Sequence, residues 1–172
     1  MVYRTKTYIA AAWEEDSDAV EQLLTWNDSD RFSLEFKNIH DYKQARDESL
    51  PCSIKKSLSE RMDYCKVFIL IVGPYTTSVK KGYCMYCPAY KAFGEDCSIG
   101  TFKKNKSFIE FECDKARREY QNGHMKILVL YNASMEMKEW CPESLRDIGV
   151  HVPMKSHGVW DYMKVRTAFL LL

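Results

Sequence analysis

The sequence predicts a single α/β domain, a three-layer sandwich in which helices cover both faces of a five-stranded parallel sheet. Apolar segments of strand length alternate along the chain with segments of helical periodicity, a pattern typical of a parallel sheet with right-handed crossovers. Residues 67–72 and 127–131 are apolar throughout, as strands covered on both faces must be. The 172 residues suffice for one such domain, so we expect residues 1–172 to form a single unit.

The first strand is predicted at residues 7–13, and the acidic residues 14–18 that follow are suited to cap a helix. A second strand is predicted at residues 32–37, where Phe32, Leu34 and Phe36 alternate with polar residues. This alternation indicates one solvated face, as in a strand near the edge of a sheet.

The next helix is predicted to begin near Pro51, and its apolar stripe consists of Ile54, Leu58, Met62 and Cys65. The central strand 67–72 follows and is ended by Gly73 and Pro74. A further helix is expected from Ser107 to a left-handed cap at Asn122 and Gly123, and it leads into the strand 127–131.

The last part of the chain predicts a short helix from Pro142 to Gly149, a weak strand at residues 151–153 and a terminal helix from Trp160 onward. A solvated second strand favours the flavodoxin-like strand order 2-1-3-4-5. Residues 79–106 are too polar and too rich in Gly, Cys and Lys to continue the alternation, so we interpret them as a Cys-rich insertion at one edge.

Charge and hydropathy narrow the classes of partner. The 25 Lys and Arg residues nearly balance the 24 Asp and Glu residues, so no overall field attracts the chain to nucleic acid or to an anionic membrane, and a small ligand or a protein partner is favoured. The sequence contains neither an apolar run long enough to span a membrane nor a signal peptide, which predicts a cytoplasmic protein. Its seven cysteines are therefore expected to be thiols or metal ligands.

Cys84 and Cys87 have the spacing of half a zinc site, and Cys97 and Cys113 are its candidate partners. The spacings to these partners are loose, and Cys113 is also explained as a small buried residue of a helix. A structural zinc ion and a set of reduced thiols both remain open.

In an open parallel sheet, ligands bind beyond the carboxyl ends of the strands. Ser107 and Glu110 form a capping box at a helix start on this edge. Glu112 then lies in the second turn beside Phe108, at the border of a stripe expected to be buried: Ile109, Cys113, Ala116 and Tyr120. The positive helix end is expected to favour the ionised carboxylate.

Three short motifs resemble the TIR-like proteins of bacterial Thoeris-type antiphage defence, a group once classed as a domain of unknown function. Residues 6–10 resemble the opening strand of that family, and residues 67–76 resemble its hydrophobic strand with a Gly-containing loop. Residues 108–112, Phe-Ile-Glu-Phe-Glu, resemble its aromatic-x-x-aromatic-Glu helix start. The resemblance covers residues 1–135 and is carried by the motifs together rather than by any one of them.

The resemblance implies an NAD-consuming enzyme in which Glu112 is catalytic and cleaves the nicotinamide–ribose bond. NAD is then the substrate, no further cofactor is required, and a cyclic ADP-ribose-type product signals to a downstream effector. Assembly into a homo-oligomer or filament on activation is also implied. Candidate residues for binding NAD lie at the ligand edge: Ala12, Trp13, His40, Asp41, Gly73, Tyr75, Thr76 and Phe108.

Two alternatives remain beside this interpretation, a non-catalytic TIR adaptor and an enzyme similar to nucleoside deoxyribosyltransferases. Other nucleotide-binding classes are excluded on specific motifs. No Gly-x-Gly-x-x-Gly follows the first strand, and the chain contains no Gly-x-x-x-x-Gly-Lys.

Overall fold

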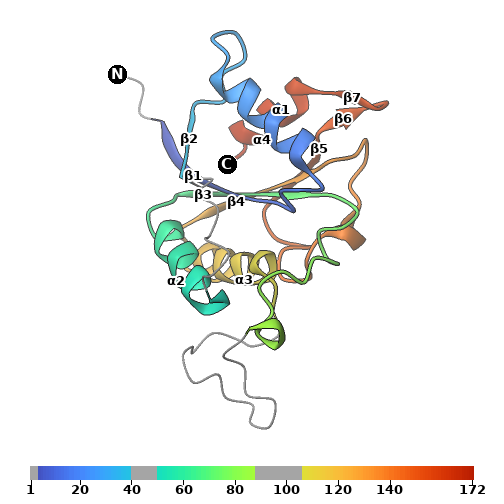
Figure 1. Ribbon diagram of the computed structural model, residues 1–172. Helices are drawn as coiled ribbons and strands as arrows, with labels where there is room; N and C mark the ends of the chain where they lie inside the picture. Colours follow the sequence, from blue (N-terminus) through green and yellow to red (C-terminus); the bar gives the residue numbers. More distant parts are fainter. Residues whose placement is uncertain (1–3, 40–49, 88–105) are drawn as a thin grey trace.

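The computed structural model describes residues 4–39, 50–87 and 106–172. Its main sheet has five parallel strands in the order β2-β1-β3-β4-β5, as the sequence predicts. Helices α1 and α4 lie on one face of this sheet and α2 and α3 on the other (Figure 1). The strands are β1 (Thr5–Ala10), β2 (Phe36–Asn38), β3 (Val67–Val72), β4 (Lys126–Tyr131) and β5 (Val150–Pro153). The helices are α1 (Ser17–Asp28), α2 (Pro51–Met62), α3 (Phe108–Gln121) and α4 (Tyr162–Leu170).

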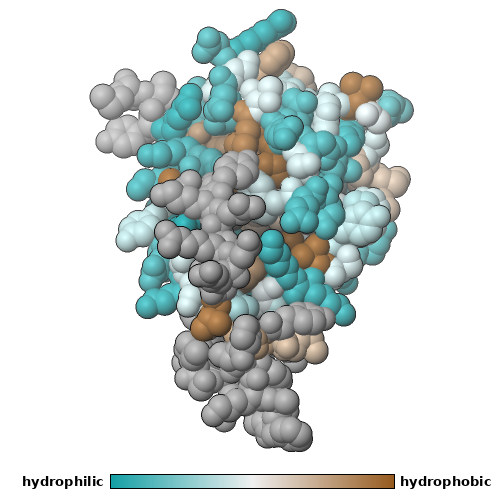
Figure 2. Space-filling view, viewed as in Figure 1, coloured by the Kyte–Doolittle hydropathy of each residue, from teal (hydrophilic) through white to brown (hydrophobic). Residues whose placement is uncertain are grey.

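Each face of the sheet has its own apolar core because neighbouring residues of a strand point to opposite faces. Tyr8 and Ala10 of β1 face α2 and α3, whereas Ile9 and Ala11 face α1 and α4. All six residues of β3 are buried, as expected for a central strand covered on both faces. Figure 2 shows hydrophilic side chains over most of the described surface on one face of the molecule, with apolar atoms in smaller areas between them.

Three smaller elements accompany these layers. Two short 3₁₀ turns, η1 (Cys84–Tyr86) and η2 (Lys138–Trp140), lie in the connections after β3 and β4. A two-stranded hairpin of β6 (Lys155–Ser156) and β7 (Val159–Trp160) precedes α4. Among the residues that the structure describes, no helix is long and apolar enough to cross a lipid bilayer.

One predicted strand is shorter than expected, and one predicted helix is wrong. The second strand is limited to β2, because Glu35 has a left-handed backbone (φ 58°) that interrupts the alternation of residues 32–37. Phe32 and Leu34 are instead half-buried residues that pack beside the α1 and α4 core. Residues 142–149 form turns rather than a helix, and β5 follows them directly.

Several predicted boundaries also shift. β1 begins two residues before the predicted first strand and ends at Ala10, so Ala12 and Trp13 lie in the loop beyond it. The terminal helix begins at Tyr162 because Trp160 belongs to the hairpin. Tyr120, predicted to be buried, is 40% exposed.

Candidate active site

The start of α3 is fixed by the capping box that the sequence predicts. The Glu110 amide donates to Ser107 Oγ at 3.1 Å, and the Ser107 amide donates to Glu110 Oε2 at 2.7 Å. Lys55, fully buried on α2, donates from Nζ to the Lys106 carbonyl oxygen at 2.8 Å. These contacts hold the first turn of α3 against α2, and the Phe108 amide also donates to Lys81 in the loop after β3.

Glu112 lies one turn further along α3 and is only 3% exposed. Its Oε1 atom accepts a hydrogen bond of 2.5 Å from the hydroxyl of Tyr8 on β1. Both residues are on the α2 and α3 side of the sheet, as are Ala10 and Ala12, whose side chains end at the β carbon. A carboxyl group is therefore enclosed between α3 and the central part of the sheet.

The expected ionisation of Glu112 is wrong for the free protein. Burial raises the pKa of this carboxyl from 4.5 to about 8, and the Tyr8 hydrogen bond offsets that rise only in part. A helix N-terminus stabilises an anion by about 0.3–2 kcal/mol, whereas each pKa unit corresponds to about 1.4 kcal/mol. Loss of hydration thus outweighs the helix dipole, and Glu112 is mainly protonated at neutral pH.

The predicted aromatic contacts do not all come together. Phe108 packs beside the core on the Glu112 side of the sheet, whereas Trp13 packs beside the core under α1 and α4. Tyr75 is 59% exposed in the loop after β3. Of these three rings, only Phe108 shares the layer of Glu112. His40 and Asp41 lie outside the described residues.

Polar groups of the loop after β3 already have hydrogen-bond partners within the protein. The Gly73 amide donates to Thr76 Oγ1 at 2.8 Å. The buried carboxyl of Asp16 lies over Gly73, where a β carbon would come within 2.0 Å of Asp16 Oδ1. Asn132 Nδ2 donates to Asp16 Oδ1 and to Asp18 Oδ1, at 3.0 Å each. A phosphate at Gly73 and Thr76 would therefore displace an existing hydrogen bond next to a carboxyl group.

Three of the four predicted zinc ligands lie within the described residues. Cys84 and Cys87 are buried at η1, whereas Cys113 is buried in the core between α3 and the sheet. Within residues 4–39, 50–87 and 106–172, no three Cys, His, Asp or Glu side chains are close enough to hold a metal ion. Cys97 lies outside these ranges. Burial raises the pKa of the Cys113 thiol well above its usual value.

Tyr8 is the contact that sequence reasoning missed. A tyrosine on a strand predicted to be buried is itself a signal, because a buried phenol hydroxyl needs a hydrogen-bond partner. The identity of that partner depends on how α3 packs across β1, and the two residues are 104 positions apart. The sequence predicts both the helix start that contains Glu112 and the strand that contains Tyr8, but it does not predict the hydrogen bond between the two residues.

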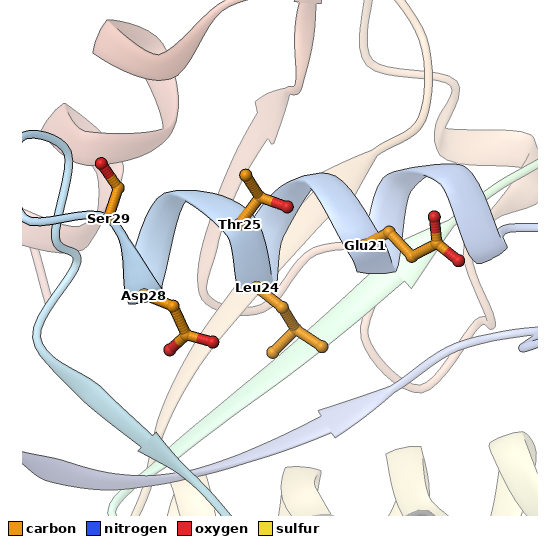
Figure 3. Close-up of a pocket in the computed structure, with 5 residues that line it drawn as sticks. All are labelled: Glu21, Leu24, Thr25, Asp28 and Ser29. Carbon is orange, nitrogen blue, oxygen red and sulfur yellow. The ribbon is translucent and has the colours of Figure 1, made fainter.

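Two cavities in the described part of the chain are lined by residues other than Glu112. One, of about 570 Å³, is open and lies along α1, on the opposite face of the sheet from α3. Its lining residues are Glu21, Leu24, Thr25, Asp28 and Ser29 (Figure 3). The other, of about 410 Å³, lies between β5 and α4.

Comparison with known proteins finds a matching family for the N-terminal part of the chain. Residues 8–81 match the family model described as "Thoeris protein ThsB, TIR-like domain". The match covers a little under half of the chain. It includes the end of β1 and all of α1, β2, α2 and β3, but it ends before α3 and Glu112. No curated protein matches the sequence. Residues 8–81 are thus similar to the TIR-like domain of the Thoeris protein ThsB.

Proposed function

We propose that this protein is an NAD-consuming TIR enzyme in which Glu112 promotes cleavage of the nicotinamide–ribose bond, forming a cyclic ADP-ribose-type signal for a downstream effector. The observation that supports it best is the enclosed carboxyl of Glu112, in the second turn of a helix that begins at the ligand edge of the sheet. The match of residues 8–81 to a TIR-like domain agrees with this proposal, because the resemblance to TIR enzymes implies NAD as the substrate.

The chemistry needs one carboxylate. Nicotinamide is bound to ribose through a pyridinium nitrogen, so it leaves as a neutral base with the electron pair of the broken bond. Protonation of the leaving group is therefore unnecessary, unlike in the hydrolysis of an O-glycoside. Ribose C1′ gains positive charge in the transition state, and an adjacent carboxylate stabilises that charge most strongly where water is excluded.

The raised pKa of Glu112 fits this sequence of events. The free carboxyl is mainly neutral, with a pKa of about 8. A bound pyridinium ring brings a positive charge beside it and favours the ionised form, so a proton leaves the site as NAD binds. At neutral pH the carboxylate is then the main form only when substrate occupies the site.

The enclosure of Glu112 also favours a cyclic product. Only 3% of this residue is exposed. When water has little access to C1′, a nucleophile within the same dinucleotide competes more effectively with hydrolysis. This nucleophile forms the new bond to C1′ and then releases its proton.

The deciding experiment is mass spectrometry of the products after incubation with NAD, with and without lysate from phage-infected cells, since the resting protein can require a trigger. We expect E112Q to abolish nicotinamide release. E119Q is the matched control, because Glu119 lies on the same helix and pairs instead with exposed His124.

Deoxynucleosides form a second arm of this experiment. Base exchange on deoxynucleosides without NAD consumption would favour a deoxyribosyltransferase. If E112Q consumed NAD at the rate of the wild type, the proposed role of Glu112 would be wrong. Unchanged antiphage protection by E112Q, together with no NAD consumption by the wild type under either condition, would favour the adaptor.

A further inference from the structure

Tyr8 combines three properties that a group holding another side chain requires. It is fully buried on β1, between β2 and β3 in the sheet. Its ring is stacked on Phe68 of β3, with centroids 5.9 Å apart and planes at 7°. Phe68 is also the residue with which Tyr8 is in register across the two strands. The position of the phenol ring is therefore set by the sheet itself.

The hydrogen bond from Tyr8 has a definite direction. Burial and the neighbouring Glu112 both raise the pKa of the Tyr8 phenol well above 10.0, so the hydroxyl keeps its proton and donates it. The acceptor is Glu112 Oε1, at 2.5 Å. A glutamate side chain has three rotatable bonds, and one fixed donor removes much of that freedom.

This contact distinguishes the two oxygens of the carboxyl group. Oε1 is engaged by Tyr8. Oε2 is then the oxygen that this contact leaves for a ligand. On the same side of the sheet, Ala10 and Ala12 are buried residues whose side chains are single methyl groups. A carboxylate that acts on C1′ depends on such orientation, because small errors in position are costly to catalysis.

We propose that Tyr8 is the positioning residue of Glu112, its hydroxyl holding Oε1 so that Oε2 faces the sugar of the substrate. This inference rests on the proposed NAD-cleaving function and identifies the group that orients its catalytic carboxylate. In this role Tyr8 touches neither the substrate nor the reacting atoms, and its effect on catalysis is transmitted through Glu112.

The test compares Y8F with Y131F. Tyr131 is a matched control because it is a buried tyrosine on the same face of the sheet. Its hydroxyl is hydrogen-bonded to His151 Nδ1 at 2.8 Å rather than to Glu112. Both variants lose one buried hydroxyl, so both are expected to unfold at a somewhat lower temperature.

Only Y8F is expected to lose turnover. We expect its kcat for NAD to fall on the order of 10- to 100-fold while KM changes little, whereas Y131F keeps the kcat of the wild type. Equal kcat values in Y8F and Y131F would overturn the inference.

A second measurement separates this inference from the proposed function. Three-bond NMR couplings report χ1 and χ2 of Glu112, whose signals are assigned by their absence in E112Q. We expect one rotamer in the wild type and in Y131F, and rotamer averaging in Y8F. If no NAD is consumed by the wild type, the proposed function fails, and the couplings still decide whether Tyr8 holds the carboxyl. Identical couplings in all three proteins would refute the positioning role.

Discussion

At the scale of single residues, the main property of Glu112 is a pKa raised by burial away from water. Its pKa of about 8 lies above its ordinary value of 4.5, so the folded protein binds this proton more tightly than the unfolded chain does. The stability gained from burying the neutral carboxyl is fully present below pH 4.5 and is lost as the pH rises through 8. Glutamine cannot ionise, so we expect the unfolding temperature of E112Q to rise relative to that of the wild type across this window.

The control for this prediction is E119Q, whose unfolding temperature should follow that of the wild type at every pH. Thermal melts at intervals from pH 4 to pH 9 would measure both differences. A constant gap between E112Q and the wild type across this range would contradict the assignment of a buried neutral carboxyl.

The same ionisation predicts the pH dependence of catalysis. If the carboxylate form acts on NAD, kcat/KM should increase with pH and level off above about 8, since this ratio reports the free enzyme. The kcat profile should have a lower midpoint, because the bound pyridinium favours ionisation. Initial rates at saturating and limiting NAD would separate the two profiles, and a kcat/KM that declines from pH 6 to pH 8 would contradict this role of Glu112.

A separate prediction concerns the stability contributed by Gly73. This residue has no side chain, which leaves room for the Asp16 carboxyl. An added β carbon would meet Asp16 Oδ1 at 2.0 Å, and the carboxyl is anchored by Asn132. We expect G73A to lower the free energy of unfolding by about 1–3 kcal/mol and to cost less in a D16A background. Urea denaturation of the double-mutant cycle would measure the coupling, and strictly additive effects would show that the two sites are independent.

At the scale of elements, the start of α3 is stabilised by its capping box. S107A removes the acceptor for the Glu110 amide and should cost about 1 kcal/mol, or an unfolding temperature lower by roughly 2–4 °C. S53A is the matched control, since Ser53 is exposed in the first turn of α2. Calorimetry would measure both changes, and equal unfolding temperatures for the two variants would contradict the structural importance of the cap.

The elements that the sequence predicted well are those with strong local signals. The capping box of α3, Pro51 at the start of α2 and the apolar strand 67–72 each depend on neighbouring residues alone. β2 differs because its position depends on distant contacts. Asn27 at the end of α1 accepts from the Phe36 amide and donates to the Phe36 carbonyl oxygen. No pattern within residues 32–37 reveals those contacts.

The candidate site shows the same division. The position of Glu112 in the second turn of a capped helix follows from local sequence. Its protonation state does not, because desolvation depends on how closely the sheet and α3 pack around it. The sequence predicts Trp13 and Phe108 together at the ligand edge. In the structure, Phe108 packs beside the core under α2 and α3, and Trp13 packs beside the core under α1 and α4. The direction in which a loop residue turns depends on tertiary packing rather than on its distance along the chain.

At the scale of the whole molecule, the sheet order predicts how stability is distributed. β3 lies between β1 and β4 and is buried along its whole length, whereas β2 and β5 are the edge strands, with three and four residues. Local opening exposes edges before centres. In hydrogen exchange, we therefore expect the amides of β3 to exchange most slowly and those of β2 to exchange earliest among the five strands.

Asn27 allows this distribution to be tested, because it ties β2 to α1 through both backbone groups of Phe36. N27A leaves the Phe36 amide and the Phe36 carbonyl oxygen without their side-chain partner, which costs about 1–3 kcal/mol. We expect this loss to destabilise the edge strand β2 before the rest of the sheet. We expect faster exchange in residues 36–38 and little change in β3 and β4, measured by mass spectrometry of peptides under native conditions. Uniform acceleration across all five strands would show instead that β2 opens only when the whole sheet unfolds.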